Sequence, residues 1–160
     1  MAYTGKRCGM NDNLDALETW AATLLAKLQP AQRRMVIRQV AQDLRRSQSQ
    51  RIATQQQPDG TSYVPRKNLR QKKGRIKQQR QQMFSKMRTA THLKINADDA
   101  QLAIGFVGRI ARIARVHQEG LRERVAKNGP EYQYPSRVLL GFSDADRELI
   151  QDSLLRHIDM

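Results

Sequence analysis

The sequence has one cysteine, few aromatic residues and no long apolar run. Cys8 has no second cysteine to bond with, so an intrachain disulfide and a CxxC metal or redox pair are excluded. Aromatic residues make up 5% of the chain and most apolar residues are aliphatic, which favours helices over a large sheet sandwich. No run approaches the roughly eighteen apolar residues of a membrane span, and the N-terminus lacks the apolar core of a signal peptide. We therefore expect one small domain, made inside the cell, with no membrane partner.

The motifs of metal and acyl-transfer chemistry are also missing. His92, His117 and His157 are far apart in the sequence, and neither an HExxH pair nor a GxSxG elbow occurs. The glycines of GFVG at 105–108 lack the further residues of a phosphate-binding loop, so tight backbone packing explains them better. His117 falls on the apolar stripe of a predicted helix, which favours a hydrogen-bonded histidine at a core edge or a subunit contact over a catalytic base. We predict no enzymatic activity, no cofactor and no metal.

Acidic residues are missing from residues 60–97, where eleven basic side chains occur. The net charge of the whole chain is +14, so most of it comes from this segment. Such a segment attracts phosphates or an acidic protein surface. Two alternatives stay open: an arm that contacts DNA phosphates without reading the base sequence, and an arm that stays solvated or folds against an acidic partner. The candidate residues for a DNA channel or an acidic partner are Arg66, Lys67, Arg70, Lys72, Lys73, Arg75, Lys77 and Arg80.

Apolar residues at helical spacing predict two helices near the N-terminus. The first covers about 14–28 after a cap at Asp12 or Asn13. The second begins at Pro30, whose missing amide hydrogen suits a first helical turn, and runs to about Ile52. A very short joint would make the two helices a hairpin.

The middle of the chain predicts a loop, an arm and a β-hairpin. Pro-Asp-Gly and Pro65 indicate an ordered loop over 55–68. Residues 69–88 predict a mobile first half and a docked helix in the second half. Alternating apolar residues over 93–107, interrupted by the turn formers NADDA, predict a β-hairpin.

The last third predicts a helix, an exposed loop, a strand and a final helix. The spacing changes to helical at Ile110, Ile113, Ala114 and His117, and Gly120 suits a left-handed helix end. Arg109, Arg112 and Arg115 take the other face, which we expect to be solvated or turned towards another subunit. Residues 121–134 predict an exposed loop and 134–142 a third strand. Ser143 and Asp146 have the spacing of a capping box for a helix that ends near Ile158.

Together these elements predict an α+β fold. It has an N-terminal helical hairpin, a basic arm or helix, a small antiparallel sheet of about three strands with a central helix, and a C-terminal helix. Residues 1–11 are expected to be a flexible tail, and 12–160 one domain. Within it, 56–82 form the basic loop or arm, and 121–134 the exposed loop.

Four motifs in a fixed order make the chain resemble a known family. They are RIATQQQPDGTSYVPRK (51–67), MFSKMRTATHLKI (83–95), IARVHQEGL (113–121) and YPSRVLLGFSDADRELI (134–150). In this order they resemble the phage virion morphogenesis family, the gpS-type tail completion proteins of contractile-tailed phages. The resemblance extends over nearly the whole chain from about Leu14.

The resemblance implies a non-enzymatic virion protein, assembled in the host cytoplasm, that completes the tail or neck for head-tail joining. It implies a homo-oligomeric ring, with a hexamer as the expected form, next to tail-tube, sheath or neck proteins and with possible non-specific contact to transiting DNA. The candidate subunit contacts that match the family pattern are His117, Gln118, Gly120, Pro135 and Arg137. The alternative function is non-specific nucleic-acid binding through the basic arm, residues 66–88.

Overall fold

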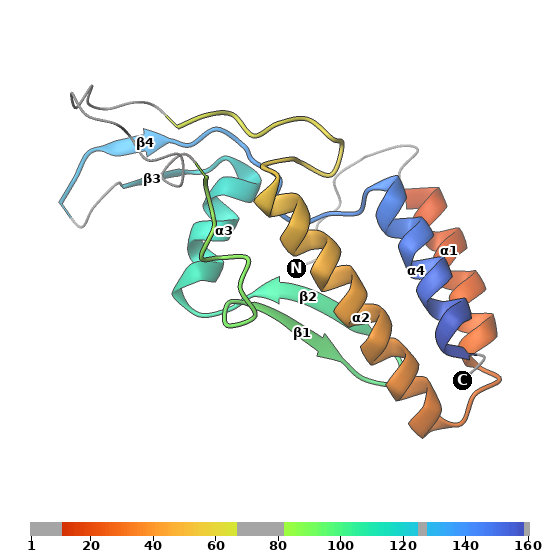
Figure 1. Ribbon diagram of the computed structural model, residues 1–160. Coiled ribbons are helices and arrows are strands. Elements are labelled where there is room, and N and C mark those ends of the chain that lie inside the picture. Colours follow the sequence, from red (N-terminus) through yellow and green to blue (C-terminus); the bar gives the residue numbers. More distant parts are fainter. Residues whose placement is uncertain (1–10, 67–81, 125–127, 159–160) are drawn as a thin grey trace.

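The computed structural model describes residues 11–66, 82–124 and 128–158, and its central element is a long helix (Figure 1). This helix, α2 (Pro30–Ala53), starts with the predicted proline, and Gln29 and Gln32 form a capping box around its first turn. Val36 and Val40 on α2 belong to one hydrophobic cluster, and Ile52 near its end belongs to another. Because one helix contributes to both clusters, it joins the two ends of the domain.

Two further helices cover one side of α2. The first helix, α1 (Asn11–Leu25), is connected to α2 by the short turn that the sequence predicts. The last helix, α4 (Asp144–Ile158), packs along α2 and lies between α2 and α1 (Figure 1). Leu154 of α4 is buried against Val36 and Val40. Helix α4, from the other end of the chain, therefore separates α1 from α2. The sequence did not indicate this arrangement.

The predicted β-hairpin is confirmed and lies on α2. Strands β1 (Leu93–Ala97) and β2 (Leu102–Phe106) are antiparallel, with Ile95 opposite Ile104. The carboxylate of Asp98 accepts hydrogen bonds from the backbone N–H groups of Ala100 and Gln101 and so closes the turn. The hairpin leads directly into the next helix.

Helix α3 (Arg109–Glu119) ends at Gly120 in the left-handed conformation, as predicted. The expected inward face is correct at Ala114, which is buried, but wrong at Ile113, whose side chain is 45% exposed. Val116 is buried instead. The helix is rotated relative to the predicted stripe, so an apolar residue joins the arginines on its outer face.

The predicted third strand is wrong. Residues 134–143 contain no β-strand, and they do not extend the β1–β2 sheet. A separate two-stranded sheet forms instead within 121–134, the segment predicted as an exposed loop. Its strands are β3 (Arg122–Arg124) and β4 (Glu131–Gln133), with Glu123 opposite Tyr132.

The segments on either side of the basic arm are ordered. Residues 55–66 form the predicted loop, in which Asp59 accepts hydrogen bonds from the backbone and hydroxyl of Thr61. Residues 82–92 form turns rather than the predicted docked helix, although Met83, Phe84 and Met87 are buried in the core with Ile52. The predicted tail and residues 67–81 of the arm lie outside the described residues. In the described ranges, no helix has the length and apolar character needed to cross a membrane.

Candidate functional site

Residues 134–141, which we call the clamped segment, have their backbone held by side-chain amides. Gln57 Oε1 accepts a hydrogen bond from the N–H of Val138 at 3.0 Å. Gln118 Oε1 accepts from Leu139 at 2.7 Å and Leu140 at 3.0 Å, and its Nε2 donates to the carbonyl of Leu140 at 2.8 Å. These bonds replace a strand partner and explain why the predicted strand does not pair. The segment keeps Leu139 fully buried without belonging to a sheet.

The start of the clamped segment lies against the end of α3. The N–H of Arg137 donates to the carbonyl of His117 at 2.7 Å, and the hydroxyl of Ser136 donates to the carbonyl of Gln118 at 3.1 Å. Gly120 has φ +65°, and a Cβ at this position would come within 3.0 Å of the backbone nitrogen of Ser136. A side chain at residue 120 would therefore be strained by its backbone and would push the clamped segment away.

Arg137 fixes the clamped segment to the loop that leads into the basic arm. Its side chain is buried, Nε donates to the carbonyl of Val64 at 2.7 Å, and one terminal nitrogen donates to the carbonyl of Pro65 at 3.2 Å. The other terminal nitrogen lies 3.1 Å from Nδ1 of His117. A guanidinium only donates, so Nδ1 of His117 is the acceptor and the neutral imidazole carries its proton on Nε2.

The imidazole of His117 lies between aromatic rings. Its ring centre is 4.9 Å from that of Phe84 and 5.1 Å from that of Tyr134, both in edge-to-face geometry. Burial, together with the positive charges of Arg137 and Arg66, lowers the pKa of His117 to about 4. A weakly basic imidazole whose acceptor nitrogen is already bonded to arginine is poorly suited to remove a proton from a substrate. The geometry favours the structural interpretation of this histidine.

We expect His117 to make stability fall between pH 6.5 and pH 4. In this window the unfolded chain binds a proton near the ordinary pKa of 6.5, whereas the folded chain binds it only near pH 4. The contribution of neutral His117 to the free energy of unfolding is therefore fully present above pH 6.5. It is lost as pH falls, at no more than about 1.4 kcal/mol per pH unit. Urea unfolding at several pH values measures this slope.

The matched variant for this measurement is His117→Asn. The side-chain oxygen of asparagine can accept the hydrogen bond from Arg137 but does not titrate. The slope between pH 6.5 and 4 should therefore shrink in the variant. An unchanged slope would mean that another group causes the pH dependence.

A second buried network holds the far end of the clamped segment, and the sequence showed only part of it. The predicted capping box is confirmed, because Asp146 N–H donates to Ser143 Oγ at 3.1 Å and Ser143 N–H donates to the carboxylate of Asp146 at 3.0 Å. The same carboxylate is fully buried and forms an ion pair at 2.6 Å with Arg51 of α2. It also accepts hydrogen bonds from Ser47 and Gln48.

Two groups of α2 extend this network to the backbone of the clamped segment. Arg51 and Gln48 both donate to the carbonyl of Gly141, at 2.8 and 3.0 Å. Burial alone would raise the pKa of Asp146, but hydrogen bonds from Ser143 and Ser47 and the charge of Arg51 hold the pKa below its ordinary value. The carboxylate thus stays charged opposite Arg51. No spacing in the sequence links residue 51 to residue 146, so this pair could not be found there.

The structure brings the candidate contact residues together. His117, Gln118 and Gly120 lie at the end of α3, and Arg137 bonds to His117 beside half-buried Pro135. Their polar groups bond within the chain, and whether this end of the molecule touches another subunit stays a prediction. Of the basic candidates, exposed Arg66 lies close enough to His117 to lower its pKa. The other basic candidates lie outside the described residues. Within the described ranges, no three His, Cys, Asp or Glu side chains are grouped to hold a metal.

Comparisons with known proteins match almost the entire chain. The model of the phage virion morphogenesis family matches residues 12–159. Tail completion protein S of Escherichia phage P2 is 40% identical over 139 residues, which cover 85% of this chain and 91% of that protein. No solved structure matches the chain. The range matched by the family model includes the whole clamped segment and all of α3.

Proposed function

Because the chain belongs to the phage virion morphogenesis family, we propose that it is a virion structural protein that completes the tail for joining to a DNA-filled head. The observation that carries this proposal is the match to a protein named tail completion protein S over 91% of its length. The match leaves only short stretches of either chain unaligned. The protein would act by geometry, as one copy in a closed homo-oligomeric ring, for which six copies is the expected number.

The end of the molecule at the clamped segment supplies one contact surface in this proposal. Val64 and Leu121 are exposed apolar residues there, next to half-buried Pro135 and exposed Ser136. The internal bonds of His117, Gln118 and Arg137 fix the shape of this end before assembly. A rigid surface loses less conformational entropy on association than a flexible one. In the proposal these polar residues do not contact the neighbouring subunit with their polar groups. They keep in place the surface that contacts it.

The basic segment has a separate role in the proposed ring. Arg66 is exposed directly after the two carbonyl groups that Arg137 holds, so the arm begins at a fixed point. From there its positive charge would face transiting DNA or an acidic surface of a tail-tube, sheath or neck protein. Contacts of this kind attract phosphates without reading the base sequence.

The mass of the purified protein in solution tests the ring. We expect size-exclusion chromatography with static light scattering to give one multi-subunit species whose mass is a fixed multiple of 18.4 kDa. A closed ring has no free ends, so its mass should stay the same over a range of protein concentrations. A monomer at every concentration, or a mass that grows without limit, would contradict the ring.

The alternative function, non-specific nucleic-acid binding through residues 66–88, has its own test. It would be favoured by DNA affinity that falls steeply with added salt, because phosphate binding releases counterions. That affinity should also vanish when Lys72, Lys73, Arg75 and Lys77 are replaced by alanine. If these substitutions abolish DNA binding in a chain that stays monomeric, the arm is the working part and the ring proposal fails.

A further inference from the structure

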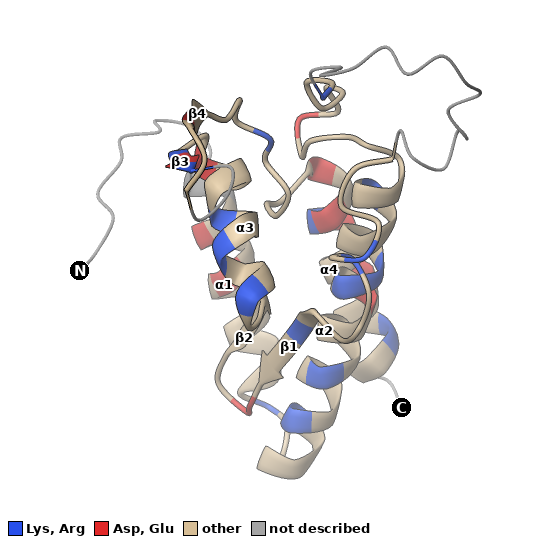
Figure 2. Ribbon diagram, turned by 90° about the vertical axis from the view of Figure 1, so that its left-hand side faces the viewer, with Lys and Arg blue, Asp and Glu red and all other residues tan. Residues whose placement is uncertain are grey.

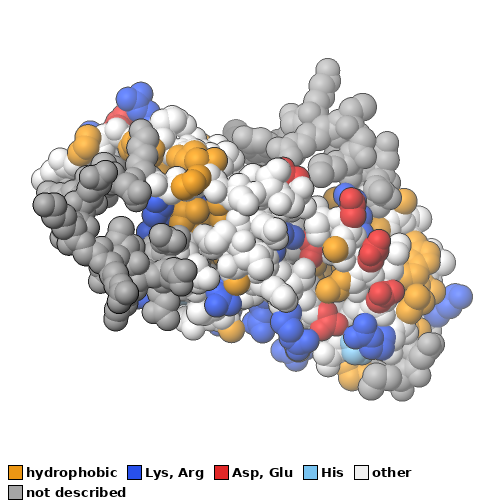
Figure 3. Space-filling model, turned by 45° about the horizontal axis from the view of Figure 1, so that its top comes forward, with side chains coloured by type: hydrophobic (Ala, Val, Ile, Leu, Met, Phe, Trp, Pro, Cys, Tyr) orange, Lys and Arg blue, Asp and Glu red, His pale blue; other side chains and the backbone are white. Residues whose placement is uncertain are grey.

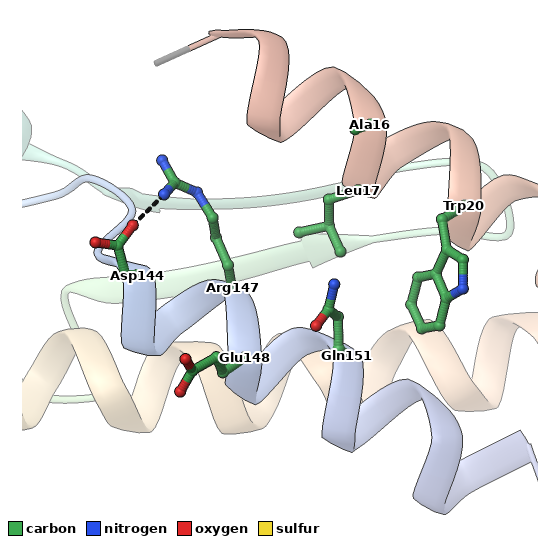
Figure 4. Close-up of a pocket in the computed structure, with 7 residues that line it drawn as sticks. All are labelled: Ala16, Leu17, Trp20, Asp144, Arg147, Glu148 and Gln151. Atoms are coloured by element: carbon green, nitrogen blue, oxygen red, sulfur yellow. Dashed lines mark hydrogen bonds and ion pairs between the residues drawn. The ribbon is translucent and has the colours of Figure 1, made fainter. Parts of the chain in front are cut away.

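A groove lies between α1 and α4, close to the point where the clamped segment leads into α4. It encloses about 500 Å³ and is lined by Ala16, Leu17, Trp20, Asp144, Arg147, Glu148 and Gln151. Figure 4 shows Leu17 and Trp20 extending from α1 towards α4, where the polar lining residues lie. One wall of the groove is therefore apolar and the other is polar. This combination suits a partner that carries both apolar and charged side chains.

The surroundings of the groove are acidic. Asp144, Glu148 and Asp152 are exposed along α4, and Asp15 and Glu18 are exposed on α1. Arg147 pairs with Asp144 and has only 13% of its side chain exposed, so it offsets little of this charge at the surface. Figure 3 shows acidic side chains in a row on the α4 side of the molecule with hydrophobic side chains beside them. A partner for this face should be basic.

The outer face of α3 has the complementary chemistry. Arg109, Arg112 and Arg115 are exposed on it, and 78% of the side chain of Arg112 is accessible. Figure 2 shows basic positions along α3. Ile113 is exposed among them. Arg112 and Arg115 pair with Glu123 and Glu119, but ion pairs at the surface are weak and exchange partners readily. A helix face of arginines around an isoleucine fits a groove with an acidic rim and an apolar wall.

The two surfaces are placed so that one molecule cannot bring them together. Helix α3 lies on one side of α2, whereas α1 and α4 lie on the other side (Figure 1). Two different complementary surfaces on opposite sides make a head-to-tail contact, which closes into a ring when the rotation between copies allows it. We propose that the groove between α1 and α4 binds the outer face of α3 of a second copy. This inference rests on the proposed ring and names one pair of surfaces within it, in addition to the surface at the clamped segment.

Charge reversal on each surface tests the contact. Glu148→Lys and Arg109→Glu should each weaken association by about tenfold or more, because each places like charges together. An acidic residue in the first turn of α3 favours that helix, so Arg109→Glu should not harm folding. The double variant should regain assembly, because the two reversed charges attract each other. Asp99→Lys in the turn between β1 and β2 and Arg38→Glu on α2 reverse charges outside the groove, its acidic surroundings and α3, and should assemble like the unmodified chain.

Trp20 supplies a second readout. It is the only tryptophan of the chain and lines the groove, so its fluorescence reports on this groove alone. On assembly its emission should shift to shorter wavelength, and Glu148→Lys should abolish the shift. If the unmodified chain and Glu148→Lys assemble equally and the emission does not change, the groove is not the contact although the ring stands. If the unmodified chain is a monomer throughout, the ring and this contact both fail.

Discussion

Replacing Asp146 by asparagine is expected to lower the free energy of unfolding by about 3–5 kcal/mol. The carboxylate is 0% exposed and Arg51 only 10% exposed, so the substitution leaves a buried guanidinium without a counter-charge. It also disturbs the cap of α4 and the support of Gly141. A small domain has about 5–15 kcal/mol of stability in total, so the loss should be visible as a large fall in the urea midpoint.

Asp144→Asn is the matched control for this prediction. Asp144 is in the first turn of the same helix and also pairs with an arginine, Arg147, but its side chain is 92% exposed. Its removal should therefore cost no more than about 1 kcal/mol. If the two variants are equally stable, the buried ion pair of Asp146 with Arg51 stabilises the fold no more than the exposed pair of Asp144 with Arg147 does.

Gln118→Ala is expected to cost about 2–4 kcal/mol, because two backbone N–H groups lose their acceptor. Both N–H groups belong to the clamped segment, and Leu139 there is fully buried. A buried donor left without a partner costs about 1–3 kcal/mol. Chemical unfolding measures the loss, and hydrogen exchange at Leu139 and Leu140 should become faster than in the unmodified chain.

Two further variants separate the hydrogen bonds of Gln118 from its volume. Gln118→Met keeps the size of the side chain and removes the same bonds, so it should be destabilised nearly as much as the alanine variant. Glu119→Ala changes the exposed neighbouring residue and should stay within about 0.5 kcal/mol of the unmodified chain. A fully stable Gln118→Met would show that water or other groups replace these bonds without cost.

Local signals in the sequence predicted the elements that depend on local chemistry. Pro30 at a helix start, Gly120 at a helix end and the Ser143–Asp146 box all act within a few residues, and all three occur where they were predicted. The β-hairpin was found for the same reason, since its alternation and turn lie within one short segment. The order of four motifs also predicted the family, which the comparisons confirm.

The features that the sequence did not predict depend on side chains far apart in the chain. An extended, apolar segment such as 134–142 is typical of a strand, but its hydrogen bonds go to Gln57 and Gln118 instead. Gln55 has a positive φ, which a glutamine in a sequence does not predict. Its side-chain amide forms hydrogen bonds with the backbone of Met83. Glutamine has no periodic pattern that distinguishes a surface side chain from one that holds a buried backbone.

Electron microscopy of the particles that form when the infecting phage cannot make this protein tests the central claim most directly. If the protein completes the tail, the images should show DNA-filled heads separate from tails that are headless or overlong, and supply of the unmodified chain should restore joined particles. Normally joined heads and tails in the absence of the protein would contradict the account.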